Sequence, residues 1–83
     1  MTDDFLLALQ NRLRALAEEQ RKRHARIAPN ITKRKLLDLA AKQEQQRIEL
    51  LAEREEEAGN LEQAKQYRQL IDAIAEVADE MDP

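Results

Sequence analysis

Only one glycine and two prolines interrupt the 83 residues of this chain. A β-fold needs frequent turns, and turns draw heavily on these two residue types, so the sequence disfavours strands. The abundant alanine, leucine, glutamate, glutamine, arginine and lysine are all strong helix formers. The sequence therefore predicts an all-α fold.

The first predicted helix covers about residues 3–27, with Thr2 or Asp3 as its cap. Leucines recur on one side of it at spacings of three, four and three: Leu6, Leu9, Leu13 and Leu16. This spacing is a heptad-type seam. Pro29 lacks an amide hydrogen and disfavours helix in the residue before it, so we expect a turn at residues 28–31.

The second predicted helix covers about residues 32–58, capped by Asn30 or Thr32. Apolar residues share one of its faces: Leu37, Ala41, Ile48, Leu51 and Ala58. Its middle, residues 42–47, contains no apolar residue. That gap indicates an exposed turn, a polar layer against a partner helix, or a kink.

Gly59 stands where a helix end uses a left-handed residue, and Asn60 follows as a helix cap with Gln63 in the capping-box position. The third helix is expected at about residues 60–81. Its seam is the most regular in the chain: Ala64, Tyr67, Ile71, Ile74, Ala78 and Met81. A turn as short as residues 59–60 predicts a tight hairpin, with the second and third helices antiparallel.

These helices belong to a single domain, residues 1–83, arranged as an antiparallel bundle or an extended helical hairpin. So short a chain has a thin core, and 13 of its apolar residues are alanines. Pairing with a second copy or with a partner's helices would supply the missing burial. We therefore expect a homo-oligomer, with the choice between compact bundle and open hairpin left open.

Residues for catalysis are missing from the sequence. It has no cysteine and one histidine, His24, which has no recognisable nucleophile or metal co-ligand. The acidic run at residues 53–57 fans outward around a helix instead of converging on a cation. The chain has two aromatic residues, and so it has few bulky side chains with which to enclose a small molecule. The sequence predicts a non-enzyme without cofactor, metal or small-molecule substrate.

Charge is distributed unevenly along the chain. Residues 1–48 carry 11 bases and 6 acids, and residues 49–83 carry 3 bases and 11 acids. Bases without an intervening acid surround the first turn: Arg21, Lys22, Arg23, Arg26, Lys33, Arg34 and Lys35. This cluster suits ordinary helix-dipole and intramolecular charge pairing, an acidic protein partner, or nucleic acid.

The stretch Ala58–Ala64 followed by Tyr67 resembles the turn and second-helix start of a tetratricopeptide repeat. It covers less than a fifth of the chain, and the repeat period of about 34 residues does not recur. No function is transferred from it.

The leading hypothesis is a protein–protein interaction module of adaptor, chaperone or inhibitor type. Its candidate partner-binding residues form two seams, one of which can serve as the core: Leu6, Leu9, Leu13 and Leu16, and Tyr67, Ile71, Ile74 and Ala78. The alternative is a small nucleic-acid-binding regulator that uses the bases from Arg21 to Lys35. A passive helical structural module is a third possibility. No stretch reaches the length and apolarity of a membrane span, and we expect a cytoplasmic location.

Overall fold

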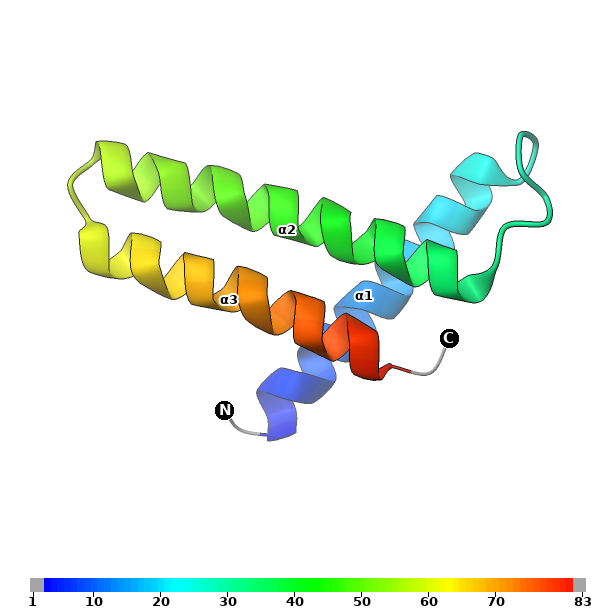
Figure 1. The fold of residues 1–83 in the computed structure, drawn as a ribbon, viewed down its shortest axis with the longest axis horizontal. Helices are drawn as coiled ribbons and strands as arrows, with labels where there is room; N and C mark the ends of the chain where they lie inside the picture. Colours follow the sequence, from blue (N-terminus) through cyan, green and yellow to red (C-terminus); the bar gives the residue numbers. More distant parts are fainter. Residues whose placement is uncertain (1–2, 82–83) are drawn as a thin grey trace.

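Three helices make up the fold of the chain. The computed structural model describes residues 3–81, with α1 at Asp3–His24, α2 at Lys33–Glu57 and α3 at Leu61–Glu80 (Figure 1). No strand occurs within those residues. The predicted all-α class and its three long helices are confirmed.

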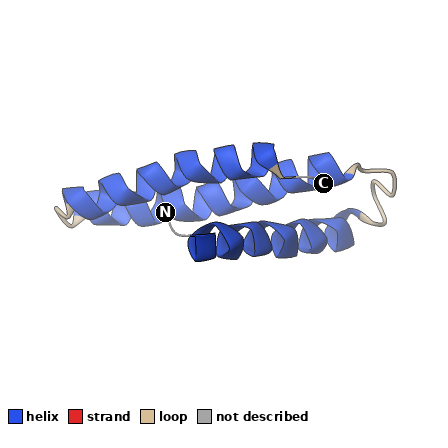
Figure 2. Cartoon of the chain, turned by 90° about the horizontal axis from the view of Figure 1, so that it is seen from below, coloured by secondary structure: helices blue, strands red, loops and turns tan. Residues whose placement is uncertain are grey.

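The helices lie in two layers. α2 and α3 form an antiparallel hairpin, and α1 crosses one face of it obliquely, near the open end (Figures 1 and 2). The molecule is elongated, 45 × 28 × 15 Å. α1 therefore covers only part of the hairpin face on which it lies.

α1 ends at His24, three residues earlier than predicted. The carbonyl of His24 accepts the amides of both Ile27 (3.1 Å) and Ala28 (2.7 Å), which closes the last turn. Pro29 follows and has no amide to continue the helix. Of the two predicted caps, Thr2 lies outside the described residues.

α2 begins where the sequence predicts. Thr32 is the cap, and its side-chain oxygen accepts the amide of Lys35 at 3.1 Å. This bond satisfies one of the donors that every helix start leaves without a helical partner.

The hairpin turn depends on Gly59, which has a φ of +82°. Its amide reaches the carbonyl of Glu56 (3.1 Å), and the amide of Asn60 reaches that of Glu55 (2.8 Å), which is the Schellman pattern of a helix end. The predicted capping box with Gln63 was wrong. The Asn60 side chain makes no cap bond because it donates to the Glu55 carboxylate at 2.8 Å instead.

The core lies where α1 crosses the hairpin and takes residues from all three helices. Leu13 of α1 and Ile74 of α3 are fully buried in it. The other buried members are Leu9, Leu37, Ala41, Ile48, Val77, Ala78 and Met81. The seams seen in the sequence are thus largely used within the chain.

Candidate functional site

The leucine seam of α1 faces the hairpin. Leu9, Leu13 and Leu16 are buried, and Leu6 at the start of the seam is 37% exposed. In this arrangement only Leu6 is available to a partner.

The α3 seam divides in the same way. Ile74 and Ala78 are buried in the core, while Tyr67 and Ile71 are half-buried and pack against it. Ile71 lies on a different part of the surface from Tyr67, beside Gln45, whose side-chain amide donates to the Ile71 carbonyl at 3.1 Å. The exposed remainder of this seam is therefore Tyr67 and part of Ile71.

A groove between the start of α1 and the first half of α3 brings Phe5, the neighbour of Leu6, next to Tyr67. Its volume is about 360 Å³, and Phe5, Tyr67, Leu70 and Ala73 line it with three glutamines of α3. None of the described residues that line it is charged. We call this the α1–α3 groove.

The α1–α3 groove adjoins a run of exposed apolar residues, of which the sequence analysis singled out only Leu6. Phe5, Leu6 and Leu7 are 41%, 37% and 54% exposed. We use the name apolar patch for these three residues at the start of α1 together with Tyr67 and Leu70 of the groove. Phe5 lies on the groove side of α1, and Leu7, about 200° further round the helix, lies on its other side. A helix start with three consecutive large apolar residues is the available signal in the sequence.

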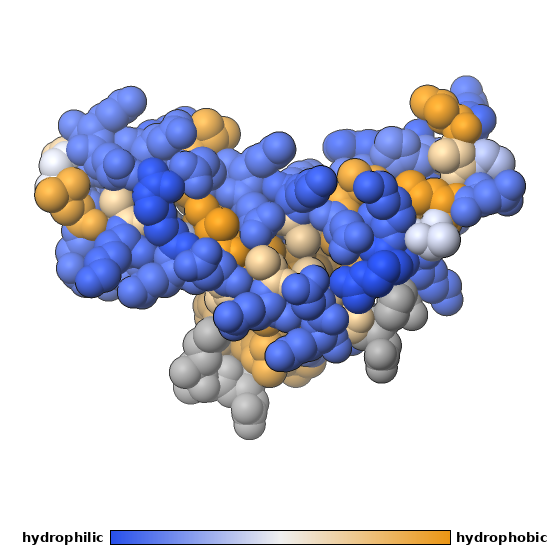
Figure 3. Space-filling model, in the orientation of Figure 1, coloured by the Kyte–Doolittle hydropathy of each residue, from blue (hydrophilic) through white to orange (hydrophobic). Residues whose placement is uncertain are grey.

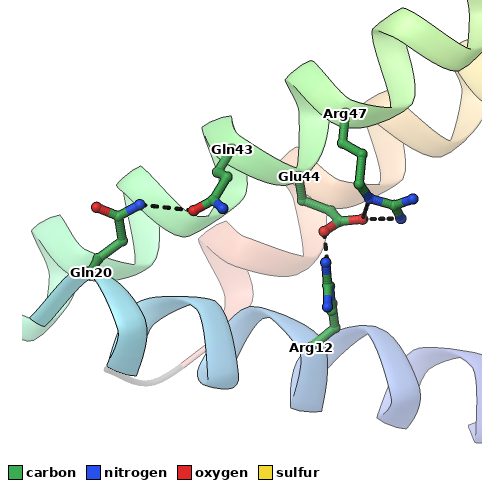
Figure 4. Close-up of polar contacts among 5 residues, drawn as sticks. All are labelled: Arg12, Gln20, Gln43, Glu44 and Arg47. Atoms are coloured by element: carbon green, nitrogen blue, oxygen red, sulfur yellow. Dashed lines mark hydrogen bonds and ion pairs between the residues drawn. The ribbon is translucent and has the colours of Figure 1, made fainter. Parts of the chain in front are cut away.

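The polar middle of α2 is a polar layer against α1. Glu44 is only 3% exposed, and its carboxylate accepts from Arg12 Nε at 3.0 Å and from Arg47 Nε at 2.9 Å (Figure 4). Beside it, Gln20 donates to Gln43 at 2.8 Å. The partner helix of this layer belongs to the same chain, and α2 runs through it without a break.

Opposing effects act on the Glu44 carboxyl. Burial raises its pKa, but the hydrogen bonds from Arg47 and Arg12, with their positive charges, outweigh burial and hold the pKa below its ordinary value. The group is therefore a carboxylate at neutral pH. It stabilises the contact between α1 and α2 and makes no contact with the apolar patch.

Two members of the basic cluster have structural partners. Arg34 bonds the carbonyls of Met81 and Ala78 at the end of α3 and lies 3.6 Å from Asp38. Arg21 pairs with Glu18, and its hydrogen bond lowers the pKa of that carboxyl.

The other five members make no ion pair within residues 3–81, and all are exposed: Lys22, Arg23, Arg26, Lys33 and Lys35. In the same part of the chain, no carboxylate of α3 forms an ion pair with the cluster. Intramolecular pairing with the acidic half therefore leaves most of the cluster without an acidic partner.

The acidic residues near the hairpin turn have other roles. Arg68 of α3 donates to Glu49 (2.8 Å) and to Glu56 (3.0 Å from Nε) on α2, and these bonds raise the pKa of Arg68. Glu53 and Glu57 are exposed. Among the residues described, no group of three acidic, histidine or cysteine side chains is placed to hold a metal ion.

His24 lies 3.2 Å from the side-chain oxygen of Gln20 through its Nε2. It is thus an extension of the polar layer between α1 and α2. As for membranes, a search of residues 3–81 finds no helix with the length and apolarity needed to cross one.

Comparison of the chain with protein-family models, with curated proteins and with solved structures finds no match. The function is therefore inferred from the surfaces of the molecule.

Proposed function

We propose that the chain is a non-enzymatic protein–protein interaction module, of adaptor, chaperone or inhibitor type, and that the apolar patch is its partner-binding surface. The observation that carries the proposal is that Phe5, the neighbour of Leu6 at the start of the α1 seam, and Tyr67 of the α3 seam line one groove. The proposed setting is the cytoplasm.

The composition of the patch supports a protein ligand. Large apolar side chains exposed side by side are a feature of interaction surfaces. Tyr67 offers a ring with a polar tip, a combination favoured at the centres of interfaces. The glutamine amides on the rim can donate and accept hydrogen bonds without the cost of burying a charge.

A photoreactive phenylalanine analogue at position 7 tests the proposal. In host extract it should crosslink to a defined protein, whereas the same analogue at position 50 should not. Leu50 is the matched control, since it is 61% exposed and lies outside the patch. The captured protein is then purified and titrated against the wild type, Leu7→Gln and Leu50→Gln by calorimetry. Equal affinity for all three would contradict the proposal.

Nucleic-acid binding is the second candidate, favoured by the exposed cations of the basic cluster without an ion pair. It predicts that binding to a duplex weakens steeply with salt and that Arg23→Glu with Lys33→Glu abolishes it. Fluorescence anisotropy with labelled duplex and single-stranded oligonucleotides measures both effects. Absence of binding at low salt would eliminate this candidate.

A further inference from the structure

The two ends of the molecule carry opposite charge. Residues 20–35 contain seven bases and no acid, and residues 49–64 contain six acids and one base. The first segment forms the turn between α1 and α2, and the second the tip of the hairpin, at opposite ends of the long axis (Figure 1). Asp79 and Glu80, near the basic end, reduce its charge without forming an ion pair with the cluster.

These ends cannot stabilise each other within one copy. The long axis measures 45 Å, whereas charges in physiological salt are largely screened beyond about 8 Å. Both ends are therefore available to a complementary surface of another molecule. A second copy turned end for end would bring opposite charges together at both ends.

The apolar patch lies between the two charged ends. α1 begins near the middle of the long axis, and apolar surface is visible there at the lower edge of the molecule (Figures 1 and 3). A twofold axis through this region and perpendicular to the long axis brings the patch of one copy against the same residues of the other. The same rotation places the basic end of each copy beside the acidic end of the other.

We propose that the partner at the apolar patch is a second copy of this chain, in an antiparallel twofold dimer. This inference rests on the proposed function and names its partner. Apolar contact through Leu6 and Leu7 holds the centre, and the charged ends set the direction. An acidic protein would match one end only, and a nucleic acid would be repelled by the other.

Charge-swapped variants provide the test. The first variant reverses the five exposed bases without an ion pair, which changes the basic end from +7 to −3: Lys22→Glu, Arg23→Glu, Arg26→Glu, Lys33→Glu and Lys35→Glu. The second reverses three exposed acids, which changes the acidic end from −5 to +1: Glu53→Lys, Glu57→Lys and Glu62→Lys. All eight residues are exposed and lie outside every ion pair formed within residues 3–81. In either homodimer the facing ends now repel, so the dissociation constant from sedimentation equilibrium should rise about tenfold or more.

An equimolar mixture of the two variants should form a heterodimer with a lower dissociation constant than either homodimer, because each reversed end then faces the opposite charge. Lys42→Glu is the control for a charge reversal away from both ends and should leave the dimer unchanged. Leu7→Gln should weaken the dimer about tenfold or more, and Leu50→Gln should not. Circular dichroism checks that every variant remains folded.

A wild type that stays monomeric at high concentration and low salt would overturn the dimer. If position 7 then still captures another protein, the proposed function stands without this partner. If it captures none, both fail. A dimer that depends on Leu7 but ignores all charge reversals overturns the antiparallel arrangement.

Discussion

Arg34, in the first turn of α2, donates from Nη1 to the carbonyl oxygen of Met81 at 3.0 Å. A second bond, from Nη2, reaches the carbonyl of Ala78. Carbonyls at a helix end carry partial negative charge, so a guanidinium placed there stabilises the helix. Arg34, a member of the basic cluster, thus connects the start of α2 with the end of α3 at the open end of the hairpin.

Replacing Arg34 with methionine should lower the free energy of unfolding by about 1–2 kcal/mol, because the carbonyls at the end of α3 lose charged donors. Urea denaturation measures this loss, and hydrogen exchange should show faster exchange at residues 78–81. Lys33→Met is the control: Lys33 is exposed, and the change should stay within about 0.5 kcal/mol. Equal effects of the two substitutions would disprove the capping role.

Glu44→Gln should destabilise the fold by about 1–3 kcal/mol at neutral pH, because a buried carboxylate loses its charged hydrogen bonds to Arg12 and Arg47. The pKa of Glu44 is held below its ordinary 4.5 in the folded state. Its contribution is therefore complete above that value and is lost as the pH falls through the folded pKa.

The pH dependence separates this effect from a packing defect. The difference in unfolding free energy between wild type and Glu44→Gln should be constant above the ordinary pKa and shrink below it. Glu53→Gln, at an exposed site, should show no comparable loss. A difference that stays constant into acid would show that the ion pairs are not its source.

Gly59→Ala should cost about 1 kcal/mol, measured by thermal or urea unfolding. The cost is conformational, because a β-carbon at this position would meet no atom within 4 Å, and the φ of +82° is strained for alanine. Gly59→Asn should cost less, because asparagine tolerates the left-handed region better. A loss of several kcal/mol would mean that the turn itself rearranges.

Ile74→Ala should destabilise the fold by about 2–5 kcal/mol, since Ile74 has no exposed surface and its truncation leaves a cavity in the core. Leu50→Ala, at an exposed site, should change stability by about 0.5 kcal/mol or less. Chemical denaturation of both variants checks the prediction. An aspartate at Leu13 or Ile74 would unfold the chain, so association is better tested at Leu7.

The helices could be predicted because their signals are local. Apolar spacing identifies the buried face of each helix, and Thr32 and Gly59 mark a start and an end. The oblique position of α1 could not be predicted, since spacing says which face is buried but not against which helix. Asn60 stands at the cap position as predicted, but its side chain makes no cap bond and donates to the Glu55 carboxylate instead, a contact that local spacing does not reveal.

The candidate site could be predicted only in part. Both seams were recognised, but most of their residues pack against one another inside the chain, which leaves Leu6 and Tyr67 at the surface. The polar stretch in the middle of α2 was visible in the sequence. Its contact with α1 was not, because that contact pairs Arg12 with Glu44, which are 32 residues apart. Such pairings depend on the tertiary arrangement, which residue order alone does not specify.

The buried Glu44 carboxylate has a consequence for the register of α1. Sliding α1 along α2 by one turn would take Arg12 away from Glu44 and separate Gln20 from Gln43, which leaves the carboxylate with Arg47 alone. α1 therefore has one favoured position along α2. The polar contacts of Glu44 and Gln20, together with the buried leucines of α1, thus set how much of the hairpin stays open to another molecule.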